Sequence, residues 1–404
     1  MKMKISMRDV KVDDTDRLSD LPDVLLLRII GFLNTKQSFQ TCVLSKRWKF
    51  LWKHLTNLIL QHSITDTIDS DVFCKFVSHI LSGRDESIPL HSLAFKHDDI
   101  RADPSKTTLL NVMRYAASHN VQQLSVIVLL NHIGDLELPY SMFNCRTLTF
   151  LRLGFCHRSR SNKTMFPKSL NLPSLKTLHL QYLTFTTSDN SLAEPFSACN
   201  MLTTLVITRC YLQDDAHALC ISNSNVSSLT INTNYDLDYE EAHNYEVVFC
   251  TPKLTSLTTA GHPTFKAPSA HDVPCLEKVK IDYCYHVAPH EYEFMCSFLQ
   301  LLVNVKKLAL CFEAFRCIEQ TLRAMARKGT QPPCFVRLKS LTVDFTTNDR
   351  EKVSNKKVRE MAKYVLQNSP PARVYIIRQE NSNMNHFYTW STTTFTSGPW
   401  SINI

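Results

Sequence analysis

The chain of 404 residues is 44% apolar and 20% charged, which is the composition of a globular protein with room for several domains or one long repeat array. Its 45 basic and 37 acidic residues give a net charge of +8, but they form no long runs, so charge alone is weak evidence for a polyanionic partner. Only 7 glycines occur and each stands alone, which argues against the glycine-rich phosphate loops of nucleotide-binding folds.

Residues 1–16 are charged and lack the apolar core of a secretory signal, and no stretch is long and apolar enough for a membrane span. We therefore expect a flexible N-terminus, no membrane partner, and residence in the nucleus, the cytoplasm or both. The 14 cysteines should then be reduced thiols. Neither a CxxC pair nor an HExxH sequence occurs, and no metal or cofactor is expected.

Residues 17–57 open with the strongly apolar segment Leu21–Leu33. Pro22 suits the first turn of a helix after Ser19 or Asp20 as its cap. Two apolar stripes then follow on different faces, the first with Leu26, Ile29, Ile30 and Leu33 and the second with Leu25 and Phe32. Two more short helices are expected, one around 36–42 and one capped by Ser45. Three short helices cannot bury two apolar faces, so we expect a partner to cover one of them.

Residues 58–120 are predicted to form a helical connector and irregular first repeats. The connector contains two amphipathic helices. The first carries Phe73, Phe76, Val77, Ile80 and Leu81 after a Ser70 cap, and the second carries Leu109, Val112, Met113 and Ala116.

From residue 121 to 332 the pattern L-x-x-L-x-L returns at intervals of about 22–33 residues, which is typical of leucine-rich repeats. It is regular at Leu148/Leu151/Leu153, Leu175/Leu178/Leu180 and Leu202/Leu205/Ile207, and a weak early copy stands at Leu90/Leu93/Phe95. The consensus position for Asn or Cys holds Cys156, Cys210, Asn234 and Cys284. The pattern predicts an α/β solenoid, a horseshoe whose short parallel strands bury their leucines.

Residues that alternate with those leucines should face outward on the concave side. We expect this face as a whole to recognise a partner, whereas for any single side chain on it a merely solvated role is favoured. The candidate recognition residues are Arg152, His179, Gln181, Asn232, Lys278, Lys280, Asp282 and Lys307. Acid–base chemistry at His179 is not favoured, because no second titratable group is tied to it by spacing.

Residues 333–379 should hold the last repeat and a capping module, with a helix that buries Val358, Met361, Ala362 and Val365 and ends before Pro370, followed by a strand at 373–377. The basic outer face of this helix could contact nucleic acid, but it lacks interleaved aromatics, so a solvated face is favoured and no nucleic-acid partner is expected. Residues 380–404 are rich in Ser, Thr and Asn and are expected to be disordered.

Several segments also resemble a known family. Leu21-Pro22, the Ile-rich first helix and the run from Val43 through Ser45, Lys46 and Arg47 to Trp48 look like an F-box. Residues 138–156, 172–185 and 196–210 resemble plant F-box proteins with leucine-rich repeats, and the C-terminal strand, helix and strand are similar to the FBD module of that family.

The resemblance implies a non-catalytic substrate receptor of an SCF-type ubiquitin ligase, which docks on a Skp-family adaptor, and through it on cullin and RING proteins, and holds an unidentified protein substrate on its repeats. Two alternatives stay open: a non-degradative scaffold, or a receptor that senses a small molecule. Carried onto this sequence, the resemblance gives the adaptor-facing residues Leu21, Pro22, Leu25, Ile29, Ile30, Leu33, Val43, Leu44, Lys46 and Trp48. Some of these must pack the bundle itself.

Overall fold

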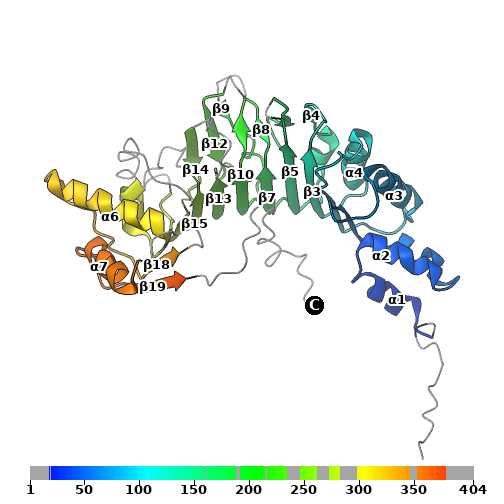
Figure 1. Ribbon diagram of the computed structural model, residues 1–404. Helices are drawn as coiled ribbons and strands as arrows, with labels where there is room; N and C mark the ends of the chain where they lie inside the picture. Colours follow the sequence, from blue (N-terminus) through cyan, green and yellow to red (C-terminus); the bar gives the residue numbers. More distant parts are fainter. Residues whose placement is uncertain are drawn as a thin grey trace, which may run out of the picture.

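The computed structural model describes residues 18, 20–159, 161–187, 192–213, 216–233, 246–261, 273–282, 298–345 and 353–378. Its framework is one sheet of twelve parallel strands that follow one another in chain order (Figure 1). This confirms the predicted α/β solenoid. The strands are β1 (Asn57–His62), β2 (Ser92–His97), β3 (Gln123–Leu130), β5 (Phe150–His157), β7 (Thr177–Gln181), β10 (Thr204–Thr208), β13 (Ser228–Asn232), β15 (Ser256–Ala260), β16 (Lys278–Asp282), β17 (Lys307–Cys311), β18 (Ser340–Phe345) and β19 (Arg373–Arg378).

A second layer of short strands lies behind this sheet. A four-stranded sheet contains β4 (Leu136–Glu137), β6 (Thr164–Phe166), β8 (Thr184–Phe185) and β11 (Tyr211–Leu212), and a three-stranded sheet contains β9 (Leu192–Ala193), β12 (Ala218–Ser222) and β14 (Glu246–Cys250). The repeat leucines are buried in the core, where Phe166 meets Phe143 and Phe185 edge to face at 5.6 and 5.5 Å. Each repeat thus buries its apolar residues against its neighbours.

At both ends of the solenoid, helices take the place of the short strands of the second layer (Figure 1). Those near the N-terminal end are α3 (Ser70–Gly83) and α4 (Lys106–Ser118), and those near the C-terminal end are α6 (Phe312–Arg327) and α7 (Asn355–Val365); short 3₁₀ turns are η3 (Tyr140–Asn144) and η5 (Leu302–Asn304). The residues that were predicted to form the apolar faces of α3, α4 and α7 are buried or half-buried. Helix α6 was not predicted, although Phe312, Phe315, Ile318 and Leu322 have helical spacing and are buried.

Three predicted helix caps were wrong. One is Ser45, because the 3₁₀ helix after it begins at Trp48 and has no side-chain cap. The side chain of Asp69, not Ser70, accepts the backbone N–H of Val72 at the start of α3, at 2.7 Å. Helix α1 (Asp23–Ile30) begins directly after Pro22, and no side chain caps it. Proline has no side-chain acceptor, and only the Pro22 carbonyl accepts N–H groups of the first turn, those of Leu25 and Leu26 at 2.9 and 3.1 Å.

The N-terminal bundle contains α1, α2 (Thr35–Gln40), η1 (Thr41–Val43) and η2 (Trp48–His54), so the third predicted helix is a 3₁₀ helix. The bundle shares a core with the first repeat. The Phe39 ring meets Trp52 at 5.4 Å and Phe76 of α3 at 5.7 Å, both edge to face. The buried Arg84, just after α3, donates to the Leu55 carbonyl at 2.9 Å. These contacts fix the bundle to the solenoid.

The predicted strand 373–377 is confirmed by β19. Residues 1–16, Asn234, Cys284 and the predicted disordered tail 380–404 lie outside the described residues.

Candidate functional site

The N-terminal bundle exposes many large apolar side chains for its size. Residue 18 and residues 20–54 include eight such side chains, with relative exposures from 37% to 82%: Leu18, Val24, Leu25, Ile29, Phe32, Val43, Leu44 and Phe50. Leu25 and Ile29 lie one turn apart on α1 and share one side of it, and Phe32 follows in the turn after the helix. Exposed apolar side chains at this density mark a surface that a partner covers.

The salt bridge between Arg47 and Asp23 brings the two parts of this surface together. The Arg47 guanidinium contacts the Asp23 carboxylate at 2.7 Å and also donates to the Leu21 carbonyl. The pairing holds the Val43–Leu44 turn, only three residues before Arg47, against the N-terminal end of α1. We call the exposed residues Val24, Leu25, Ile29, Phe32, Val43 and Leu44 the bundle patch.

The bundle patch differs in part from the sequence-predicted adaptor residues. Ile30 is fully buried and Trp48 is 4% exposed, because both fill the core between the bundle and the first repeat, so the candidate surface is redrawn without them. Pro22 and Lys46 are exposed, whereas Leu21 and Leu33 are half-buried.

Val24 and Phe32 were not among the predicted adaptor-facing residues, although their side chains are 76% and 64% exposed. For Phe32 the signal was available, since it lies on the second apolar stripe with Leu25. For Val24 no stripe pointed outward, and only the tertiary structure shows it.

All eight predicted recognition residues lie on the outward face of the main sheet. The parallel register places them in three rows that cross the strands. The first row contains Lys278 and Lys307, the second contains Arg152, His179 and Lys280, and the third contains Gln181, Asn232 and Asp282. The buried leucines alternate with them along each strand, as the repeat pattern predicts.

His179 is unsuited to acid–base chemistry near neutral pH. Its strand neighbour in register is Arg152, and the Phe150 ring lies 5.4 Å from its imidazole. Burial and the Arg152 charge lower the pKa of His179 to about 4, so the ring is neutral at pH 7. Burial also lowers the pKa of Arg152. The pair forms a half-buried polar spot within the face.

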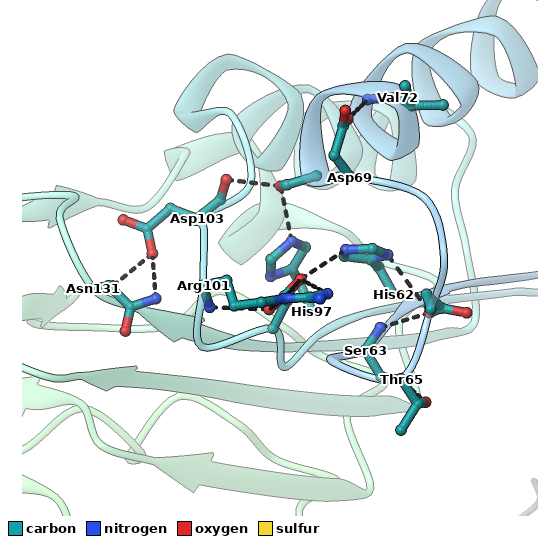
Figure 2. A network of polar contacts seen from close by, with 12 residues as sticks. His62, Ser63, Thr65, Asp69, Val72, His97, Arg101, Asp103 and Asn131 are labelled. Atoms are coloured by element: carbon teal, nitrogen blue, oxygen red, sulfur yellow. Dashed lines mark hydrogen bonds and ion pairs between the residues drawn. The ribbon is translucent and has the colours of Figure 1, made fainter.

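A buried polar cluster at the N-terminal end of the solenoid contains serine, histidine and aspartate (Figure 2). His62 and His97 are register partners of β1 and β2, with ring centroids 5.0 Å apart. The Ser70 hydroxyl lies 2.9 Å from His97 Nε2 and 2.8 Å from the Asp103 carbonyl, to which it donates. Because the hydroxyl proton is given to that carbonyl, His97 can only donate to Ser70, which is the reverse of nucleophile activation.

The role of this cluster is structural. The Asp103 carboxylate accepts the backbone N–H groups of Asn131, His132 and Ile133 at 2.5, 2.6 and 2.9 Å, and so holds the loop after β3. Ser70 and His97 are at most 4% exposed. The cluster therefore joins three successive repeats and offers no access to a substrate.

The described part of the chain contains no group of three or more His, Cys, Asp and Glu side chains that could hold a metal. None of its helices has the length and apolarity needed to cross a bilayer. A pocket of about 350 Å³ lies between α6 and α7, lined among others by Phe312, Arg323 and Met361. Arg323 pairs there with Glu319 and stacks on Tyr364 at 4.2 Å, so its charge is already satisfied.

Comparisons with known proteins agree with this architecture. Residues 18–60 match the F-box domain, and residues 109–285 match the leucine-rich repeats of the FBD-associated F-box protein At5g56370. The small bundle with its apolar patch thus corresponds to an F-box domain, and the solenoid joined to it corresponds to leucine-rich repeats.

The chain is similar to F-box proteins with leucine-rich repeats from a plant. It is 31% identical to the putative F-box/FBD/LRR-repeat protein At4g13965 of Arabidopsis thaliana, over 65% of this chain and 57% of that relative. It is 26% identical to F-box/FBD/LRR-repeat protein At1g78750 of the same plant, over 82% of this chain and 72% of that relative. The chain thus spans little more than half of the first relative.

Proposed function

We propose that this protein is the non-catalytic substrate receptor of an SCF-type ubiquitin ligase. The bundle patch docks on the Skp-type adaptor, and through it on cullin and RING proteins, while the outward face of the main sheet holds a protein substrate. The observation that carries the proposal is the shared core of bundle and solenoid, formed around Phe39, Trp52, Phe76 and Arg84. A receptor acts by tethering, and a rigid connection between two binding surfaces raises the effective concentration of the substrate at the ligase.

Adaptor binding is tested with purified full-length protein and a Skp-type adaptor. We expect Phe32→Asp and Leu44→Asp each to weaken binding by at least about tenfold, because a buried carboxylate without a partner costs several kcal/mol at an interface. Met201→Asp is the matched control, since Met201 is 50% exposed but lies in the repeats. Isothermal titration calorimetry gives the affinities. Equal binding by all three variants would contradict the proposed surface.

The ligase role is tested in plant cells. Affinity capture with the proteasome inhibited should enrich a protein whose abundance rises on inhibition and also rises when Phe32→Asp replaces the wild type. A captured partner whose abundance does not respond to either change would instead indicate a scaffold. We also place the protein in the nucleus or cytoplasm, which imaging of a fluorescent fusion of the full chain checks.

A further inference from the structure

The outward face of the main sheet changes in charge along its length. In its first two rows, strands β7, β10, β13 and β15 present Thr177, His179, Thr204, Val206, Ser228, Thr230, Ser256 and Thr258, none of which is charged at pH 7. The same rows of β16–β19 present Lys278, Lys280, Lys307, Ala309, Ser340, Thr342, Arg373 and Tyr375. Four cations and no carboxylate therefore occupy these eight positions.

These four cations, Lys278, Lys280, Lys307 and Arg373, which we call the basic end, are all exposed. Lys278 and Lys307 are direct register partners, so their backbones are only about 4.8 Å apart. Like charges directly opposite one another on a sheet are unfavourable. Lys278 and Lys307 therefore repel each other, and uncharged residues at these two positions would let the protein fold at least as well.

Carboxylates in the described part of the chain do little to neutralise the basic end. Glu277, which precedes Lys278, is engaged by Lys306. Lys280 reaches Asp282 only at 3.9 Å, the limit of an ion pair. Within the described residues, Lys278, Lys307 and Arg373 make no side-chain ion pair. Asp282 and Asp344 lie in the third row, toward the carboxyl ends of the strands.

The edge strand β19 adds an apolar contact to this surface. Tyr375 and Ile377 are 47% and 46% exposed, and Tyr375 stands two residues from Arg373 on the same side of the strand. An exposed ring beside clustered cations suits a protein segment that combines anionic groups with an apolar side chain.

We propose that the basic end binds an anionic segment of the substrate protein, in which carboxylates or phosphoserines face Lys278, Lys280, Lys307 and Arg373 and an apolar side chain packs on Tyr375. This inference rests on the proposed receptor function and names the chemical class of its substrate. Charge complementarity selects the occupant, because an anion removes the repulsion between the lysines and gains charge-assisted hydrogen bonds.

The test uses the full chain and three short fluorescein-labelled peptides that share a central leucine. One carries glutamates, one carries phosphoserines at the same positions, and one carries glutamines. Fluorescence anisotropy at about 150 mM salt measures their affinities. We expect the glutamate or the phosphoserine peptide to bind at least about tenfold more tightly than the glutamine peptide, and added salt to weaken that binding. The stronger of the two identifies the source of the anionic groups.

The variant Lys278→Glu/Lys280→Glu/Lys307→Glu should lose at least about tenfold in affinity for the anionic peptide. The control Lys75→Glu/Arg114→Glu/Lys168→Glu makes the same change in net charge at exposed positions away from this face, and it should keep wild-type affinity. Should the basic-end triple variant unfold, Lys307→Gln alone serves, with an expected loss of about threefold.

The proposal is overturned if the glutamine peptide binds as tightly as the anionic ones, or if the control variant loses as much affinity as the basic-end variant. It is equally overturned if a single-stranded RNA of similar charge binds more tightly than both anionic peptides. Adaptor binding is measured on the same samples. If the wild-type protein binds the adaptor but not the anionic peptides, only the proposal for the basic end is rejected. If it does not bind the adaptor, the proposed receptor function is rejected.

Discussion

Several buried polar side chains of the N-terminal repeats have strongly shifted pKa values. His97 is fully buried beside His62, and its Nε2 is held by the Ser70 hydroxyl. Burial, followed by the nearby His62, lowers the pKa of His97 to about 4 from an ordinary value of 6.5. Asp99, in contrast, is kept in its charged form, because the Arg101 guanidinium holds the pKa of the Asp99 carboxyl well below its usual range.

The lowered pKa of His97 predicts a specific acid sensitivity. Between pH 6.5 and about 4 the unfolded chain binds a proton at this residue that the folded protein does not, so the free energy of unfolding falls as the pH drops through this window. The loss from His97 is about 3 kcal/mol at most and levels off below its folded pKa. Urea unfolding across the window should show a shallower pH dependence for His97→Gln than for the wild type.

Other groups with lowered pKa values add to this acid dependence. His179 titrates in the same window, so His97→Gln should remove only part of the dependence. Asp99 contributes stability that is lost below its ordinary pKa of 3.8, at lower pH than the histidine effect. An identical slope for the wild type and His97→Gln between pH 6.5 and 4 would show that His97 is protonated in the folded state.

At the level of elements, the contact between η2 and α3 fixes the bundle to the solenoid. Gly83, the last residue of α3, lies under the Trp52 ring, and a Cβ at this position would approach Trp52 Cη2 to 2.9 Å. The close approach leaves no room for a side chain. Glycine is therefore required here by packing, and not by its backbone freedom.

Gly83→Ala should lower the free energy of unfolding by about 1–3 kcal/mol, since the added methyl forces Trp52 out of its packed position. Gly134→Ala is the control, because a Cβ at Gly134 has no heavy atom within 4 Å. Thermal unfolding followed by circular dichroism measures both. If the two variants melt at the same temperature, the junction is looser than the contacts indicate.

At the level of the whole molecule, the shared core makes the bundle and the first repeats one mechanical unit, whereas distant repeats touch only their neighbours. Arg84 is central to this unit, as it donates to the carbonyls of Leu55, Ile88 and Pro89 at 2.9, 2.6 and 3.0 Å. Ile59 of β1 also donates its N–H to the Thr35 hydroxyl of α2 at 2.8 Å.

Hydrogen exchange of the wild type should therefore show similar opening free energies for the amides of α1, α2 and β1. Arg84→Met leaves three carbonyls without their donor and should speed exchange in these elements at least about tenfold, while β10 and β13 stay unchanged. Arg114→Met, at an exposed arginine of α4, should alter neither region. Fast exchange of the wild-type bundle relative to β1 would contradict a rigid connection.

Much of the solenoid follows from the spacing of its apolar residues. The leucine pattern predicted the strands and their outward residues, because a buried side chain at every second position leaves its neighbours on the opposite face. Helix α6 was not predicted, although charged residues between its apolar positions, such as Glu313 and Arg316, which pair at 2.6 Å, are typical of an amphipathic helix.

Some features of the candidate site likewise follow from the sequence, and others depend on the tertiary structure. The sequence by itself determined that the N-terminal segment has more apolar surface than a small bundle can bury, and that a repeat face lies behind it. Only the tertiary structure decided that Ile30 and Trp48 turn inward while Val24 and Phe32 stay exposed. It also decided that lysines far apart in the chain, such as Lys278 and Lys307, become neighbours. The physical reason is that periodicity sets which residues share a face, whereas packing between elements sets what covers that face.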